Sequence, residues 1–198
     1  MTSSYTKHLR ILETIALEGR ISSYKLSTKL GVSVSHAQWW LQNHPEIIEV
    51  DRDPKGRRTV WYGLSMIGFL LALKRRKVEQ NFTFVFENFL NYQSEMKNDP
   101  ILKRNMLNAL KSNETAEKLK QFYMSISKAL DNLTDIYSLD DATVVELATL
   151  LAFKQDKQMY SIFRDLYLAK VGVFRQVVKA YREVAENFDK LLEEDTPK

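Results

Sequence analysis

The sequence predicts a mainly α-helical protein with a β-hairpin in its first third. Apolar residues recur at spacings of three and four through most of the 198 residues, which is the repeat of helices with one buried face. Two short segments alternate apolar and polar residues instead, which is typical of strands. Serine or aspartate precedes several periodic segments, where its side-chain oxygen can cap a helix. We therefore expect residues 1–77 to form one domain of helices and a hairpin, and residues 78–198 to form an all-helical domain.

Three helices are expected before the hairpin. The first begins near Tyr5 and stops at Gly19, and the second begins after a pair of serines and ends at Leu30. Gly31 then allows a tight turn before the next helix. A helix, a turn that contains glycine and a further helix form a helix-turn-helix, whose last helix enters the major groove of DNA.

The last of the three helices, the expected recognition helix, covers residues 34–44. Ser33 can cap it and Pro45 ends it. Its inner face carries four residues at helical spacing, Ala37, Trp40, Leu41 and His44.

The hairpin pairs residues 47–52 with residues 59–64. Ile48 and Val50 alternate with acidic residues in the first strand, and the inward set of the second strand is Val60, Tyr62 and Leu64. The loop between the strands holds three cations, Lys55, Arg57 and Arg58, although a turn needs only its Pro and Gly. The loop is therefore expected to meet an anion, and a solvated turn is the alternative.

Two motifs in this order resemble the winged helix-turn-helix of MarR-like and PadR-like transcription regulators. The segment Asp53-Pro54-Lys55-Gly56-Arg57-Arg58 is similar to the Asp-Pro-x-Asp-Arg-Arg wing of MarR-like proteins, with Gly56 in place of an acidic residue. The segment 62–71 resembles the x-Leu-Thr-x-x-Gly-x-x-Leu that ends the wing and starts the next helix, which Ser65 would cap. The resemblance covers residues 5–75 and leaves the C-terminal region unrecognised.

This resemblance implies sequence-specific binding of double-stranded DNA by a transcription regulator. Helix 34–44 would lie in the major groove, and the basic wing 52–58 would contact the minor groove or phosphates. The implied DNA-binding residues are Ser33, Ser35, His36, Gln38, Trp39, Gln42, Lys55, Arg57 and Arg58. For Trp39 and Trp40, an equal alternative to a DNA contact is that both rings are packed, one in the core and one against the wing or a dimer partner.

Charge and composition narrow the function classes. Residues 1–77 contain thirteen Lys and Arg against six Asp and Glu, whereas the rest of the chain is slightly acidic. The chain has no cysteine, and its histidines, His8, His36 and His44, show no metal-ligand spacing with carboxylates. We expect no metal, no cofactor and no enzymatic activity, because no catalytic motif is present.

No apolar run is long enough to span a bilayer, and the N-terminus lacks the apolar core of a signal peptide. The expected location is cytoplasmic, in a prokaryotic cell and associated with the nucleoid.

The rest of the chain is helical by pattern. One helix is expected to begin after Ser65, to run past Lys77 with a kink near Asn81, and to end near Asn98. Further helices start at Asp99-Pro100, at Ser112-Asn113 and at Ser138–Asp141. The four cations at 74–77 could contact DNA that flanks the recognition site, or they could lie on the solvated face of a helix.

The final helix carries a heptad-like seam, which predicts a homodimer. The dimerisation residues of this seam are Tyr160, Phe163, Tyr167, Phe174, Val177, Tyr181, Val184 and Phe188. The alternative is packing within one chain, because Ile162 and Leu166 widen the apolar surface beyond a narrow stripe.

Two other uses of such a fold stay open. A winged helix can serve protein assembly or RNA binding, since fold does not dictate function. A pocket for a small apolar effector is also open, although the sequence shows no polar anchor for one.

Overall fold

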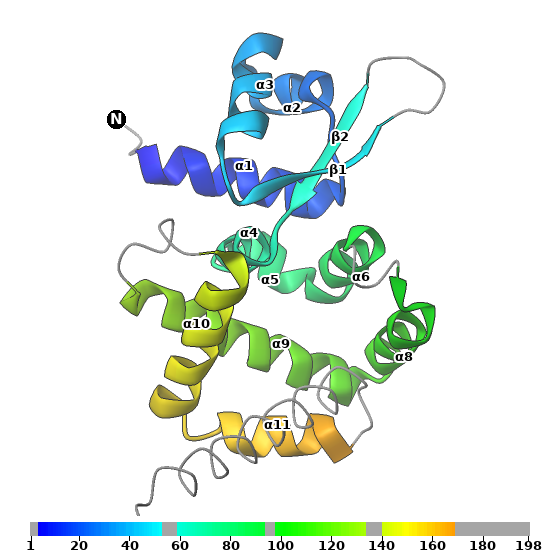
Figure 1. The fold of residues 1–198 in the computed structure, drawn as a ribbon, viewed down its shortest axis with the longest axis vertical. Helices are drawn as coiled ribbons and strands as arrows, with labels where there is room; N and C mark the ends of the chain where they lie inside the picture. The colour runs from blue at the N-terminus through cyan, green and yellow to red at the C-terminus, as the bar shows by residue number, and fades with distance from the viewer. Residues whose placement is uncertain (1–3, 53–58, 94–97, 134–139, 169–198) are drawn as a thin grey trace, which may run out of the picture.

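The computed structural model describes residues 4–52, 59–93, 98–133 and 140–168 (Figure 1). The protein is mainly helical, as predicted, with one two-stranded antiparallel sheet. The elements in chain order are α1 (Ser4–Glu18), α2 (Ser23–Leu30), α3 (Val34–Asn43), β1 (Ile47–Arg52), β2 (Val60–Leu64), α4 (Met66–Ala72), α5 (Arg76–Gln80), α6 (Phe82–Tyr92), α8 (Pro100–Leu110), α9 (Asn113–Ala129), the 3-10 turn η1 (Leu130–Asn132), α10 (Asp141–Gln155) and α11 (Met159–Leu168). None of the described helices has the length and apolarity needed to cross a membrane.

The three helices expected before the hairpin are confirmed. The hydroxyls of Ser22 and Ser33 cap α2 and α3 by accepting hydrogen bonds from backbone amides three residues ahead. Gly31 ends α2 at a φ of 68°, a left-handed conformation that glycine adopts without strain. The turn from α2 to α3 therefore takes only three residues.

The predicted hairpin is present, but its register is interrupted. Glu49 pairs with Tyr62 and Asp51 with Trp61, so Val50 lies in a bulge between them. The bulge interrupts the pairing but not the expected alternation in burial, since Ile48 and Val50 are half-buried and Glu49 and Asp51 are exposed. Tyr62 also exchanges two backbone hydrogen bonds of 2.9 Å with Ile21, which ties the segment after α1 to β2.

Helix α4 lies between the two ends of the molecule in Figure 1, with α1 and the hairpin on one side and α9 and α10 on the other. Every residue from Ile67 to Ala72 is buried. A single cluster of buried apolar side chains extends from Leu9 in α1 to Leu166 in α11. The domain boundary after residue 77 stays a prediction, and Val78, immediately beyond it, is fully buried in this same cluster.

The long helix expected from Ser65 to about Asn98 is wrong. The chain forms three shorter helices, α4, α5 and α6, which are separated by a tight turn at residues 73–75 and by Asn81. The breaks let α6 fold back against α1 and β2 instead of extending away from them. At the first break, Lys74 pairs with Asp131, so this cation joins two parts of the protein rather than facing solvent alone.

The later helix starts are mostly as expected. Asp99 caps α8 with Pro100 in the first turn, and Ser112 caps α9. The cap of α10 differs from the prediction, because Asp140 accepts the hydrogen bond from the backbone of Thr143 and the helix begins only at Asp141.

Gly68 makes a stability prediction possible. A methyl group at this position would overlap the backbone carbonyl oxygen of Glu46, which also accepts a hydrogen bond from the amide of Ser65. At an open helical site, replacing Gly by Ala stabilises by about 0.5–1 kcal/mol. Here Gly68→Ala should instead lower the free energy of unfolding by about 3 kcal/mol, measured by urea denaturation. Gly31→Asn serves as a control and should cost only a few tenths of a kcal/mol, since Asn tolerates left-handed backbone. A stabilising Gly68→Ala would contradict the close approach.

Candidate functional site

Helix α3 presents a polar outer face. Ala37 and Leu41 are each only 2% exposed and attach the helix to the core. The outer face comprises the exposed residues Ser35, Gln38, Trp39 and Gln42. The side chains of Ser35, Gln38 and Gln42 make no hydrogen bond to any residue that the structure describes, so their polar groups can bind a partner outside the protein.

Two other predicted site residues, Ser33 and His36, also have roles inside the protein. The Ser33 hydroxyl accepts a hydrogen bond of 3.2 Å from the backbone amide of His36. The Nε2 atom of His36 accepts a hydrogen bond of 2.8 Å from the indole nitrogen of Trp40. His36 is exposed and keeps only Nδ1 for an external partner.

The two adjacent tryptophans differ in environment, and a DNA contact by Trp39 stays a prediction. Trp40 is half-buried, and its ring stacks on His44 with centroids 3.9 Å apart and an angle of 8° between the planes. Trp39 is 54% exposed and touches Trp40 and His44 only edge-on. Trp40 is thus a packing residue, and Trp39 lies on the surface.

The hairpin is anchored near its loop end. Arg20 pairs with Asp51 at 3.0 Å, and its guanidinium lies 5.1 Å from the ring centroid of Trp61. The basic tip, with Lys55, Arg57 and Arg58, lies outside the described residues, and its role stays a prediction.

Several cations of the first 77 residues are already paired. Lys25 and Lys29 on α2 both contact the carboxylate of Glu18, and these hydrogen bonds hold its pKa below the ordinary value. Arg75 donates a hydrogen bond of 2.6 Å to Glu13. Of the four cations at 74–77, the first two therefore join elements, whereas Arg76 and Lys77 are exposed.

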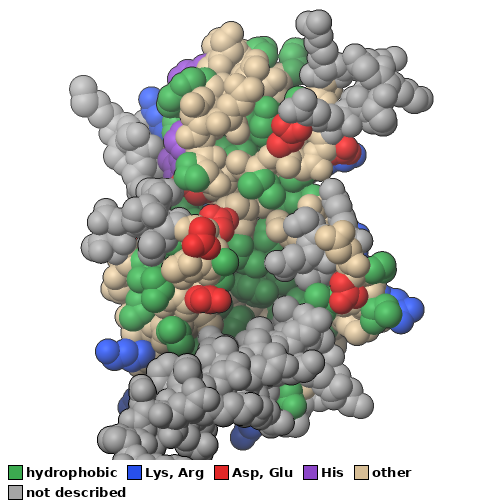
Figure 2. Space-filling model, viewed as in Figure 1, with side chains coloured by type: hydrophobic (Ala, Val, Ile, Leu, Met, Phe, Trp, Pro, Cys, Tyr) green, Lys and Arg blue, Asp and Glu red, His purple; other side chains and the backbone are tan. Residues whose placement is uncertain are grey.

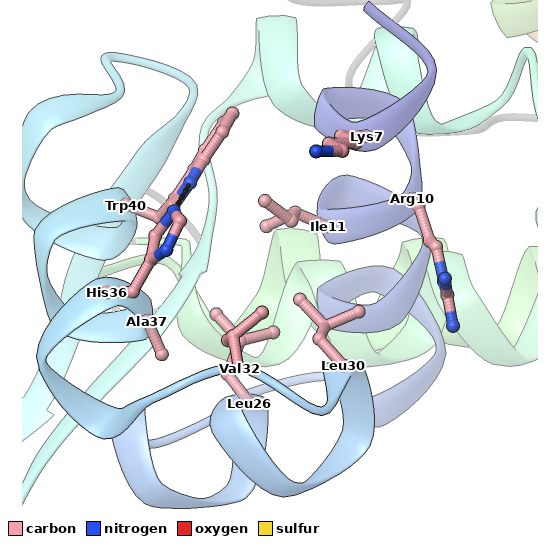
Figure 3. Close-up of a pocket in the computed structure, with 9 residues that line it drawn as sticks. All are labelled: Lys7, Arg10, Ile11, Leu26, Leu30, Val32, His36, Ala37 and Trp40. Carbon is pink, nitrogen blue, oxygen red and sulfur yellow. Dashed lines mark hydrogen bonds between the residues drawn. The ribbon is translucent and has the colours of Figure 1, made fainter. Parts of the chain in front are cut away.

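A pocket lies between α1, α2 and α3 (Figure 3). It has a volume of about 440 Å³ and is walled by apolar side chains, Ile11, Leu26, Leu30, Val32, Ala37 and Trp40. Lys7 and Arg10 line it on the α1 side, and His36 lies on the α3 side. The sequence did not predict these polar groups, because only the fold brings Lys7 and Arg10 of α1 to the same pocket as α3.

A second group that the sequence did not reveal lies beside Trp40. His8, His44 and Glu46 bring ligand-type atoms within 4.8 Å of one another. The expectation of no metal rested on spacing along the sequence, and the fold brings two of the three histidines to a carboxylate despite that spacing. Since 36 residues separate His8 from His44, no local motif could have shown the cluster. Histidine side chains reach the surface on one side of the face drawn in Figure 2.

The predicted dimerisation residues divide into three groups. Tyr160 and Tyr167 are exposed on α11. Phe163 packs inside its own chain, with ring centroids 6.4 Å from Phe122 and 5.7 Å from Phe153. The remaining five, Phe174, Val177, Tyr181, Val184 and Phe188, lie outside the described residues.

Comparison of the chain with models of known protein families, with curated proteins and with solved structures finds no match in any of the three.

The contrast between the tryptophans yields a prediction. Trp40→Ala should lower the free energy of unfolding by about 2–4 kcal/mol, because it removes a stacked ring and the hydrogen bond to His36. Trp39→Ala should change it by no more than about 0.5 kcal/mol, as expected of an exposed side chain. Urea denaturation followed by circular dichroism measures both values. Equal losses would mean that Trp39 is also part of the packing.

Proposed function

We propose that the chain binds double-stranded DNA sequence-specifically as a winged-helix transcription regulator. In this proposal α3 enters the major groove, and the loop between β1 and β2 contacts the minor groove or phosphates. The supporting arrangement is two helices joined by a three-residue turn at Gly31, followed by a hairpin whose second strand is tied at Tyr62 to the segment after α1.

The observation that carries this proposal is the outer face of α3. Base edges are recognised by hydrogen-bonding groups that are not already used inside the protein. Gln38 and Gln42 are one helical turn apart and exposed, and a glutamine amide can bind adenine through two hydrogen bonds. Ser35 adds a hydroxyl on the same face.

The support beneath α3 also fits recognition, because binding groups are most effective on a rigid element. The buried side chains of Ala37 and Leu41, the cap from Ser33 and the stacked Trp40 each limit movement of the helix. The N-terminus of α3 carries the positive end of the helix dipole, which favours a DNA phosphate there.

The charge needed for DNA affinity would come largely from the hairpin loop. Since Lys25, Lys29, Lys74 and Arg75 are paired with carboxylates, they neutralise fewer phosphates than their number implies. The wing 52–58 contributes four cations and one carboxylate. We infer that the wing determines most of the dependence of DNA binding on salt.

We further propose that two chains act together. One DNA-binding module buries only about 600–1,000 Å² of protein surface, so selectivity generally requires a second module. Exposed apolar residues on α10 and α11 support an interface in the C-terminal region; they are Leu147, Leu150, Tyr160 and Tyr167.

A protein-assembly or RNA-binding role is the second candidate, and the exposed ring of Trp39 favours it. A large aromatic side chain on a surface is typical of protein interfaces and of stacking on unpaired bases. Competition between duplex DNA, single-stranded RNA and double-stranded RNA separates the candidates, because the major groove of an RNA helix is too narrow for α3.

The first functional prediction concerns the wing. Arg57→Ala combined with Arg58→Ala should weaken binding to every duplex and lower the slope of log affinity against log salt by about 2, since each phosphate contact contributes about 0.9. Fluorescence anisotropy with labelled duplexes at several salt concentrations measures both effects.

Gln38→Ala provides the contrast in the same assay. It should cost about 1–3 kcal/mol on preferred duplexes selected from a random pool and little on random DNA. If the wing variant keeps the original salt slope, the wing does not contact phosphates. If the wild-type protein selects no duplex from the pool, the proposed function fails.

The second functional prediction concerns the dimer. Tyr160→Glu combined with Tyr167→Glu should convert a dimer into a monomer in sedimentation experiments, because it places charges on exposed positions of the proposed interface. Ile101→Glu is the control, since Ile101 is also exposed but lies on α8. A monomeric wild-type protein, or a double variant that stays dimeric, would contradict this interface.

A further inference from the structure

The side chains of His8, His44 and Glu46 converge from α1 and from the connection between α3 and β1. His8 lies on α1, His44 follows the last residue of α3, and Glu46 immediately precedes β1. The Nε2 atom of His8 lies 3.1 Å from Oε1 of Glu46, and Nδ1 of His44 lies 3.8 Å from Oε2 of the same carboxylate. The cluster thus lies where α1, the expected recognition helix and the hairpin meet.

The interior position of the carboxylate makes the cluster unusual. The side chain of Glu46 is 2% exposed, that of His8 12% and that of His44 22%. A carboxylate at this depth loses most of its hydration, and nearby positive charge and hydrogen bonds offset the cost. Its partners in the cluster are two imidazoles, which carry a positive charge only when protonated.

The imidazole nitrogens are available to a ligand. The Nε2 atoms of His8 and of His44 are both buried and make no hydrogen bond to any residue within the described ranges. Neutral imidazole is the form that binds metal ions.

From this geometry we propose that His8, His44 and Glu46 form a binding site for one divalent transition-metal ion of the Zn²⁺ class. Two imidazoles and one carboxylate form a donor set that Zn²⁺ accepts, with bonds of about 2.0–2.2 Å and a fourth position open to a small ligand. Bonds of that length place neighbouring donor atoms about 3.3 Å apart in a tetrahedral site. Nε2 of His8 lies 3.1 Å from Oε1 of Glu46, and the cluster brings one ligand atom from each of the three residues within 4.8 Å of the others. The set contains nitrogen donors and no thiolate, so it suits Zn²⁺ better than Mg²⁺ or Cu⁺.

The bound ion would place a positive charge beside the buried carboxylate of Glu46. It would also join the end of α3 to α1, next to the ring of Trp40, which stacks on His44. Because the ion binds only the folded arrangement, it stabilises the protein in proportion to its occupancy. This site does not depend on the proposed DNA binding, and it is tested without DNA.

The experiment uses the untagged, full-length protein after treatment with EDTA and removal of the chelator. Zn²⁺ is titrated in competition with a chromophoric chelator of about 1 μM affinity. The expected result is one Zn²⁺ per chain and a higher melting temperature with Zn²⁺ than with EDTA. Co²⁺ should produce the visible absorption of a tetrahedral site.

Single substitutions identify the ligands. His8→Gln, His44→Gln and Glu46→Gln should each weaken Zn²⁺ binding by at least about tenfold, because even loss of an outer partner of a metal ligand costs about 10- to 100-fold. His36→Gln is the matched control, since His36 is on α3 but outside the cluster, and its affinity should equal that of the wild type.

Two results would overturn the proposal. One is a wild-type protein that neither withdraws Zn²⁺ from the chelator nor gains thermal stability from it. The other is binding that is as tight in the three cluster variants as in the His36→Gln control. Far-UV circular dichroism shows whether each variant is folded. If a variant is unfolded, the Co²⁺ spectrum of the wild-type protein decides whether a tetrahedral site with nitrogen donors exists.

Discussion

The burial of α4 is the constraint on which the rest of the structure depends. This helix is apolar on all sides, so it needs neighbours in every direction to keep water away from it. Gly68 permits the backbone before β1 to approach closely, and the hydroxyl of Ser127 donates a hydrogen bond of 2.6 Å to the carbonyl oxygen of Leu70. The hairpin and the C-terminal helices are thereby attached to the same short segment. Any rearrangement of the first 77 residues relative to the remainder would have to repack α4.

Polar contacts around this core determine the orientation of the elements. The amide of Leu64, at the end of β2, donates a hydrogen bond of 3.1 Å to the hydroxyl of Tyr92, at the end of α6. Burial raises the pKa of Tyr92 to about 12, so its hydroxyl stays protonated over the ordinary pH range. The ring also occupies the space that a side chain at Gly63 would need. Steric fit and a hydrogen bond thus fix the hairpin against the helical body at one point.

The same helix, α3, connects the two proposals made for this protein. Its outer face carries the unused polar groups that support DNA recognition, and its last turn adjoins the cluster of His8, His44 and Glu46. Trp40 belongs to both surroundings, because it hydrogen-bonds to His36 and stacks on His44. Specific recognition needs both a rigid support and exposed polar groups. In α3 the inner side provides the support and the outer side carries the polar groups.

The sequence by itself determined the features that depend on neighbours within about four residues. These include the mainly helical class, the caps at Ser22 and Ser33, the turn at Gly31, and the division of α3 into a buried face and an exposed one.

Only the tertiary structure decided features that join distant residues. The helical periodicity predicted one helix from Ser65 to Asn98, because periodicity does not show that α6 folds back to pack against α1 and β2. Nor could it bring His8 to Glu46. Packing depends on which surfaces meet in space, and local spacing carries no information about contacts across more than thirty residues of chain.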